Sequence, residues 1–126
     1  MSKCNKNESL ILENFKYWQS RDLYVNLMEN FIDNKIIATE FVEKFFEMWK
    51  FDRDRKVNFK NLSYVTRNFE LTKLDKFSDL VLILFNDCEV FEPDPVLRDK
   101  YEIDEIELKE CVKKILLKIK NIKKVT

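Results

Sequence analysis

The stretch DEIELKECVKKILLKIKNI, residues 104–122, has the clearest helical pattern in the chain and indicates the class of its fold. Asp104 is a natural N-cap, and Glu107 three residues later completes a capping box. Apolar residues then recur at helical intervals on one predicted face: Ile106, Cys111, Val112, Ile115, Leu116, Ile119 and Ile122. Lysines fill most other positions toward the C-terminal end, where positive charge suits the helix dipole. The stretch therefore predicts an amphipathic helix.

Four earlier stretches show the same periodicity, at residues 10–18, 23–33, 38–51 and 74–90. Residues 38–51 carry a broad aromatic stripe, which we interpret as core and not as a base-stacking platform. Residues 74–90 are apolar nearly all round, which predicts a central helix. Residues 52–56 form a mixed charge run that we interpret as a solvated face. Residues 62–69 predict either a short helix or a packed loop.

The absence of glycine among the 126 residues also favours helices, because tight hairpins depend on glycine. A chain of this length fits one domain. We therefore predict an all-α fold, an antiparallel four-helix bundle with an extra N-terminal helical segment. Within the single domain 1–126, residues 1–22 form the N-terminal extension and residues 23–122 the bundle.

The three cysteines, Cys4, Cys88 and Cys111, are far apart and follow no paired spacing. Cys88 and Cys111 fall on apolar faces, where a free thiol behaves as a small hydrophobe. The N-terminus lacks the apolar run of a signal peptide, and no stretch reaches the 18 apolar residues of a membrane helix. These features predict a cytoplasmic protein with free thiols and no membrane partner.

The composition argues against catalysis. The chain has no histidine, which is the commonest general base and metal ligand, and no glycine-rich loop that could hold a phosphate. A carboxylate pair such as Glu92 and Asp94 could do acid–base work, but it lies in a predicted loop, and nothing in the sequence indicates a pocket that would raise a pKa. We therefore predict no enzymatic activity, no cofactor and no metal.

Residues 87–107, here named the acidic segment, stand apart because they carry a formal charge of about −7 in a chain of zero net charge. Both prolines, Pro93 and Pro95, lie within it. Nine carboxylates belong to it: Asp87, Glu89, Glu92, Asp94, Asp99, Glu102, Asp104, Glu105 and Glu107. Acidic side chains on a stiffened loop can be spaced somewhat like nucleic-acid phosphates, which suits a protein that blocks a nucleic-acid-binding partner. The charges alone fit a solvated loop between two helices equally well.

The segment also carries a resemblance. EVFEPD at residues 89–94, YEID at residues 101–104 and the helix that follows are similar to the colicin D immunity protein family. Residues 27–43 resemble the first two helices of that family, with Lys35-Ile36 and Glu40-Phe41 as matching residues. Three features depart from the family: residues 1–22 have no counterpart, residues 52–76 form a longer connection, and Ile37 replaces a Ser or Thr cap.

The resemblance implies an immunity protein that binds a basic, tRNA-cleaving toxin nuclease domain one to one and occludes its active-site cleft. It implies no direct contact with nucleic acid. The expected partner-binding residues are Glu89, Glu92, Asp94, Asp87, Asp99, Tyr101 and Glu102. Phe91 is expected to anchor the loop to the core, and Tyr101 either anchors it or contacts the partner.

Two other functions remain open at this point. A scaffold module would dock another helix through exposed aromatic residues such as Trp18 or Tyr17, with the acidic loop merely solvated. A direct RNA binder would use the lysines of the last helix, although no aromatic residues are interleaved with them.

Overall fold

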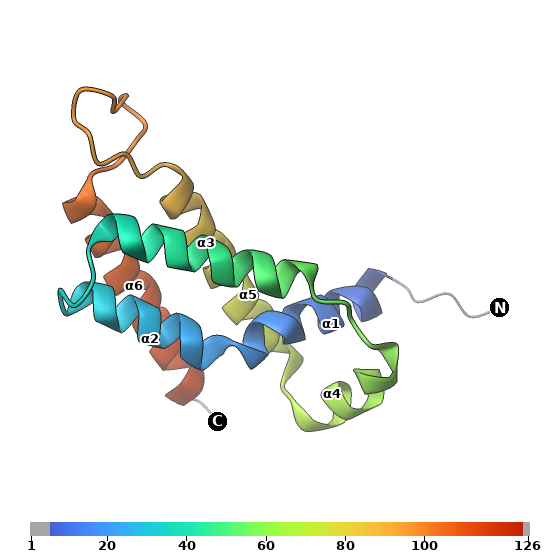
Figure 1. Ribbon diagram of the computed structural model, residues 1–126. Coiled ribbons are helices and arrows are strands. Elements are labelled where there is room, and N and C mark those ends of the chain that lie inside the picture. Colours follow the sequence, from blue (N-terminus) through green and yellow to red (C-terminus); the bar gives the residue numbers. More distant parts are fainter. Residues whose placement is uncertain (1–5, 125–126) are drawn as a thin grey trace.

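The computed structural model describes residues 6–124, with side chains from residue 7 to residue 122 (Figure 1). Its elements are α1 (Lys6–Gln19), α2 (Arg21–Ile32), α3 (Ala38–Asp54), the 3-10 helix η1 (Phe59–Asn61), α4 (Leu62–Asn68), α5 (Leu71–Glu89) and α6 (Glu105–Lys124). The prediction of an all-α fold is confirmed, and of the two alternatives for residues 62–69, a short helix or a packed loop, the structure has the helix, α4. Cys4 lies outside the described residues, as do the side chains of Lys123 and Lys124.

Four long helices and α1 make up most of the molecule. A five-residue turn joins α2 to α3, so that α3 runs back along α2 (Figure 1). Asn34 in this turn has a φ of 63°, a left-handed conformation that asparagine tolerates better than most residues. Helices α5 and α6 pack against each other, α6 also packs on α2, and α1 packs chiefly on α5. The arrangement is compatible with the predicted four-helix bundle carrying an extra N-terminal helix.

The core is largely aromatic. Phe31 and Phe41 are fully buried and stack at 4.7 Å between ring centroids, and Phe45 is fully buried beside them. The interpretation of the aromatic stripe as core is therefore confirmed for Phe41 and Phe45. Each such side chain contributes about 1.5–3 kcal/mol when it leaves water. Trp49, at the margin of the stripe, is half-buried and meets Phe85 of α5 at 4.3 Å.

Helix α1 shares this core instead of lying beside it. Leu12, Phe15 and Trp18 are buried within the same cluster as the side chains of α2, α3, α5 and α6. The ring of Trp18 meets Phe77 of α5 edge-on at 5.7 Å. Residues 10–18, which have no counterpart in the resemblance to the immunity family, therefore help to form the body that carries the acidic segment.

Two predictions about buried faces were wrong. Ile106 was assigned to the buried face of α6 but is 75% exposed, whereas Leu108 is fully buried. Two residues correspond to about 200° around a helix, so a face that buries Leu108 and Val112 turns Ile106 toward solvent. In α5, Leu82 and Ile83 are exposed, so this helix is not buried on all sides. Its neighbours leave one side of it open to water.

Asp52 corrects the interpretation of residues 52–56 as a solvated face, because its side chain is only 1% exposed. Its Oδ1 accepts hydrogen bonds from Ser20 Oγ at 2.8 Å and Arg55 Nη2 at 3.0 Å. Its Oδ2 accepts one from Tyr24 Oη at 2.7 Å. Burial and this hydrogen bond raise the pKa of Tyr24 well above its usual range. The Asp52 network ties the α1–α2 junction to the C-terminal end of α3.

Candidate functional site

The acidic segment forms a loop that projects from one end of the molecule, at the upper left in Figure 1. Its base is closed where α5 ends and α6 begins. Phe91 and Ile103 form a parallel bridge, in which Ile103 N donates to Val90 O at 2.8 Å and Glu92 N donates to Ile103 O at 3.0 Å. Residues 90–104, here named the acidic loop, therefore have the closed ends of an Ω-loop, a form that is often functional.

The arm of the loop that leaves α5 is braced by its own carboxylates. Glu92 Oε2 accepts a hydrogen bond from Asp94 N at 3.2 Å, and Asp94 Oδ1 accepts one from Val96 N at 2.9 Å. The carbonyl oxygen of Asp94 accepts from the backbone N–H groups of Leu97 and Arg98. Proline fixes φ on both sides of Asp94, which further limits the motion of this turn.

The returning arm is organised in the same way. Asp99 Oδ1 accepts hydrogen bonds from the backbone N–H groups of Tyr101 at 2.8 Å and Glu102 at 3.1 Å. Glu102 Oε1 accepts one from Asp99 N at 3.0 Å. A carboxylate has about four lone-pair sites, so each of these groups is held in place while it keeps sites that face outward.

The two basic residues of the loop do not neutralise its carboxylates through ion pairs. Arg98 is turned inward, where its Nε donates to Glu92 O at 2.9 Å and its Nη2 donates to Pro93 O at 3.2 Å. The ammonium group of Lys100 lies 4.9 Å from the ring centre of Tyr101. Arg98 thus serves as an internal brace for both sides of the turn, a role that the sequence did not reveal.

Carboxylates elsewhere in the described chain form ion pairs more often. At least seven of those fourteen pair with lysine or arginine, and none of the nine in the acidic segment does. Within residues 6–124, Glu89 and Glu105 accept neither a hydrogen bond nor an ion pair. The segment therefore presents its negative charge to the outside without a cationic partner of its own.

Of the predicted site residues, Asp87 and Glu89 lie in the last turns of α5 and the other five lie in the acidic loop. Asp87 is half-buried, and burial raises its pKa, while a hydrogen bond from the Cys111 thiol opposes that shift. Glu89 is exposed. The structure thus brings six of the seven residues to one projecting surface or its edge, and turns Asp87 partly toward α6.

The two aromatic residues of the segment have different roles. Phe91 is half-buried against the core, as expected of an anchor. Tyr101 is 74% exposed, so the possibility that it anchors the loop is excluded. Its backbone N–H is fixed by Asp99, which leaves the ring on the outside.

Asp104 and Glu107 form the predicted capping box. Glu107 N donates to Asp104 Oδ1 at 2.8 Å, and Asp104 N donates to Glu107 Oε1 at 3.2 Å. This box fixes the start of α6 and with it the returning end of the loop. At α3, by contrast, the N-cap is Ile37, which offers no side-chain cap, as the departure from the family pattern implied.

The surface expected of a scaffold module is not present around Trp18. Its side chain is buried between α1 and α5, so it cannot dock a partner helix, and that suggestion was wrong. Tyr17 is only half-buried and stays available.

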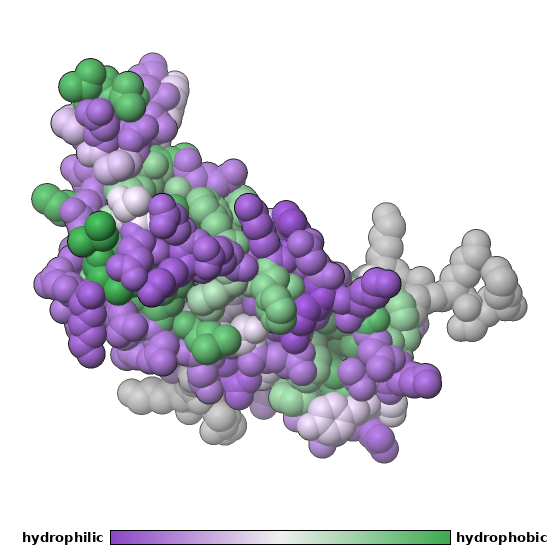
Figure 2. Space-filling model, in the orientation of Figure 1, coloured by the Kyte–Doolittle hydropathy of each residue, from purple (hydrophilic) through white to green (hydrophobic). Residues whose placement is uncertain are grey.

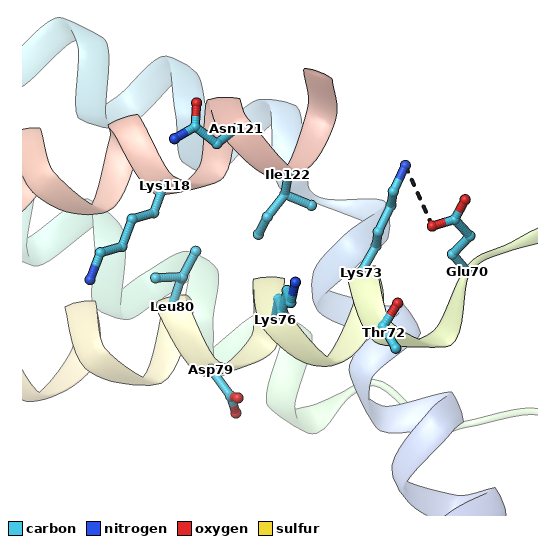
Figure 3. A pocket seen from close by; sticks show the side chains of 9 residues that line it. All are labelled: Glu70, Thr72, Lys73, Lys76, Asp79, Leu80, Lys118, Asn121 and Ile122. Atoms are coloured by element: carbon cyan, nitrogen blue, oxygen red, sulfur yellow. Dashed lines mark ion pairs between the residues drawn. The ribbon is translucent and has the colours of Figure 1, made fainter. Parts of the chain in front are cut away.

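A groove between the N-terminal end of α5 and the C-terminal end of α6 gathers lysines (Figure 3). It has a volume of about 540 Å³ and is lined by Glu70, Thr72, Lys73, Lys76, Asp79, Leu80, Lys118, Asn121 and Ile122. Lys73 pairs with Glu70 at 3.7 Å, and Asp79 offsets further positive charge. No aromatic side chain lines the groove to stack on a base, so it lacks a feature typical of single-stranded RNA sites.

Among the described residues, no three His, Cys, Asp or Glu side chains gather closely enough to hold a metal ion. No helix in that part of the chain is long and apolar enough to cross a membrane. What the acidic loop offers chemically is a set of fixed hydrogen-bond acceptors with negative charge, suited to arginine and lysine side chains of a partner.

Comparison with known proteins adds one finding. A family model described as bacterial self-protective colicin-like immunity matches residues 20–119, which includes every helix from α2 to α5, most of α6 and the whole acidic loop. No curated protein and no solved structure matches the chain significantly.

Proposed function

The chain belongs to the bacterial colicin-like immunity family, and from this premise we propose that its toxin is an RNA-cleaving nuclease, tRNA being the preferred substrate. As a member of this family the protein is a toxin inhibitor and not an enzyme. The proposal adds the mechanism: the acidic loop enters the active-site cleft of the nuclease and takes the place of the RNA backbone. The complex contains one copy of each protein.

The observation that carries the proposal is that, within the part of the chain that the structure describes, none of the nine carboxylates of the acidic segment forms an ion pair. A nuclease cleft holds RNA phosphates with Lys and Arg side chains. Carboxylates that lack an internal cation can accept charge-assisted hydrogen bonds from those side chains without first breaking an existing pair. Glu89, Glu92 and Asp94 supply the main contacts, and Asp99, Glu102 and Tyr101 extend them. Asp87 is half-buried and adds chiefly to the local field.

The internal bracing of the loop supports the same mechanism. Ordering a flexible loop on binding costs about 0.5–1.5 kcal/mol for each long side chain that becomes fixed. The bridge at Phe91 and Ile103, the two prolines and Arg98 hold the loop before the partner arrives. More of the interaction energy is then retained in the complex.

Charge complementarity also accelerates encounter. A negative loop that approaches a positive cleft associates faster than neutral surfaces do, and the gain falls as salt screens the charges. Rapid capture matters for an inhibitor that must act before its toxin reaches RNA.

The identity of the toxin class can be tested directly. The tagged protein is used to retain the toxin from producing cells, and the retained toxin domain is purified and incubated with total tRNA or with duplex DNA. We expect cleavage of tRNA that stops when the protein is added in equimolar amount. A toxin that cuts only DNA, or that forms membrane pores, would refute the ribonuclease proposal.

The mimicry mechanism has its own test. The variant Glu89→Gln, Glu92→Gln, Asp94→Asn keeps the shape of each side chain and removes three charges. We expect its binding free energy for the purified toxin domain to weaken by several kcal/mol, since charged hydrogen bonds at an interface contribute about 1.5–3 kcal/mol each. The helical circular dichroism signal should not change. An unchanged affinity would refute the mimicry mechanism.

A matched control removes the same number of charges away from the loop. Glu43→Gln, Glu47→Gln and Asp75→Asn alter exposed carboxylates of α3 and α5. Their combined effect on affinity is expected to be small and to disappear at high salt. An equal loss in both triple variants would mean that net charge, and not the acidic loop, governs binding.

A further inference from the structure

The far end of the acidic loop is apolar. Val96 is 87% exposed, Leu97 is 67% exposed and Tyr101 is 74% exposed. In Figure 2 apolar atoms gather at the tip of the projecting loop, with hydrophilic atoms around and below them. The other large apolar side chains of the loop behave in the opposite way, since Phe91 and Ile103 are half-buried against the core.

The exposure of these three side chains is fixed by the loop and not a result of local disorder. Asp94 accepts hydrogen bonds from the backbone N–H groups of Val96 and Leu97, which sets the turn that carries them. Asp99 accepts one from Tyr101 N. The backbone N–H groups at all three positions are therefore held within the loop. Those of Val96 and Tyr101 donate to the carboxylates of Asp94 and Asp99, and that of Leu97 donates to the carbonyl oxygen of Asp94.

Single exposed apolar residues are common on protein surfaces and need no explanation. Three on one braced loop are less ordinary, because such a loop gains nothing in the free protein from keeping them there. The order along the chain is informative: Asp94 and Asp99 flank Val96 and Leu97, and Asp99 and Glu102 flank Tyr101. Negative groups thus alternate with apolar groups.

Single-stranded RNA has the same alternation. Its phosphates are negative, and its unstacked bases present flat apolar faces that proteins bind with aromatic and apolar side chains. A ribonuclease cleft must therefore offer cationic positions for phosphates next to apolar positions for bases.

We propose that Val96, Leu97 and Tyr101 fill the base-binding positions of the toxin cleft while the neighbouring carboxylates fill its phosphate positions. The inference rests on the proposed function and extends it from the RNA backbone to the bases. The acidic loop would then imitate a short nucleotide chain. Affinity has two components as a result, one that salt weakens and one that salt leaves unchanged.

The experiment compares three versions of the full chain, each bound to the purified toxin domain at about 0.05 M and about 0.5 M salt. The tip variant is Val96→Ser with Leu97→Ser. Its control, Leu10→Ser with Leu23→Ser, alters two leucines of α1 and α2 that are 52% and 61% exposed. The third is the wild-type protein. We expect the tip variant to bind at least tenfold more weakly at both salt concentrations, and the control to bind like wild type.

The outcomes separate the inference from the proposed function. A tip variant that binds like wild type overturns the inference, while the carboxylate variant still decides the mimicry mechanism. If the carboxylate variant binds the toxin domain normally and the tip variant does not, both the mimicry mechanism and this inference are refuted. The tip would then be an ordinary apolar contact.

Position within the cleft is tested by cross-linking. Leu97 is replaced by a photo-reactive leucine analogue, and RNA that carries 4-thiouridine is bound separately to the toxin. The inference expects both probes to label the same toxin peptide. Labelling of different peptides overturns it even if the tip variant binds weakly.

Discussion

Asp52 and the carboxylates of the acidic loop are the same chemical group held in opposite ways. Asp52 is 1% exposed and accepts three side-chain hydrogen bonds, one of them from the guanidinium group of Arg55. The carboxylates of Glu92, Asp94 and Asp99 also accept hydrogen bonds, but within the described residues only from backbone N–H groups and without any cation.

The difference shows what separates a structural carboxylate from one that can serve a partner. Asp52 is buried, and its carboxylate accepts hydrogen bonds from three side chains of its own chain, so it is not accessible to a partner. Replacing it leaves buried donors unpaired. A loop carboxylate is held on one side only, which fixes its position and leaves acceptor sites in water. Internal partners, and not the number of charges in the sequence, distinguish the two cases.

The largest change in stability is expected from a substitution that breaks the Asp52 network. Asp52→Ala is expected to lower the free energy of unfolding by about 3 kcal/mol, because it leaves Ser20 and Tyr24 without their acceptor and removes the carboxylate partner of Arg55. The value lies at the low end for broken buried pairs because Arg55 still reaches solvent. Urea unfolding followed by circular dichroism measures it.

Asp54→Ala is the matched control, since Asp54 lies one half-turn further along α3 and is largely exposed. Its ion pair with Arg53 is exposed to solvent and is expected to contribute little to the free energy of unfolding. Folded Asp52→Ala protein should still bind the toxin domain normally, because Asp52 belongs to α3 and the acidic loop connects α5 to α6. A similar loss of stability in both variants would contradict the distinction.

An intermediate effect is expected at Asp104, which belongs to the acidic segment but caps α6. Asp104→Ala should lower the free energy of unfolding by about 1 kcal/mol, the usual value for a lost N-cap. Asp104→Ser should restore most of it, because serine is also a good cap. Urea unfolding of the two variants decides the point, and a serine variant as unstable as the alanine variant would mean that charge and not capping is lost.

Periodicity in the sequence was enough to place the helices. The capping box at Asp104 was readable, because it depends on residues close together in the chain. The burial of Asp52 was not readable. Its partners Ser20 and Tyr24 lie about thirty residues earlier, and a local run of charges gives no sign that another helix will cover one of them.

The candidate site was located by sequence but not resolved in detail. Local charge identified the acidic segment, and the family model covers it. Which side chains turn inward depended on the closure of the loop at Phe91 and Ile103, a contact across twelve residues. For this reason the bracing role of Arg98 and the exposure of Tyr101 became visible only in three dimensions.

The smallest predicted effect is the sharpest test of the comparison between Asp52 and the exposed carboxylates. Here the free energy of unfolding should rise, whereas it should fall in Asp52→Ala. Glu89 ends α5, where the helix dipole disfavours a negative charge, and it has no internal partner in the described chain. Glu89→Gln should therefore raise the free energy of unfolding by about 0.3–1 kcal/mol while it weakens toxin binding.

The control for this prediction lies at the other end of the loop. Glu105 is also exposed and unpaired within the described residues, but it begins α6, where the dipole favours a negative charge. Glu105→Gln should therefore lower the free energy of unfolding by a similar amount. Paired urea titrations at low salt measure both changes. If they share one sign, repulsion within the acidic segment outweighs the helix dipoles. If they differ as expected, Glu89 is a charge that the fold retains at a cost to its stability, as a partner-binding residue requires.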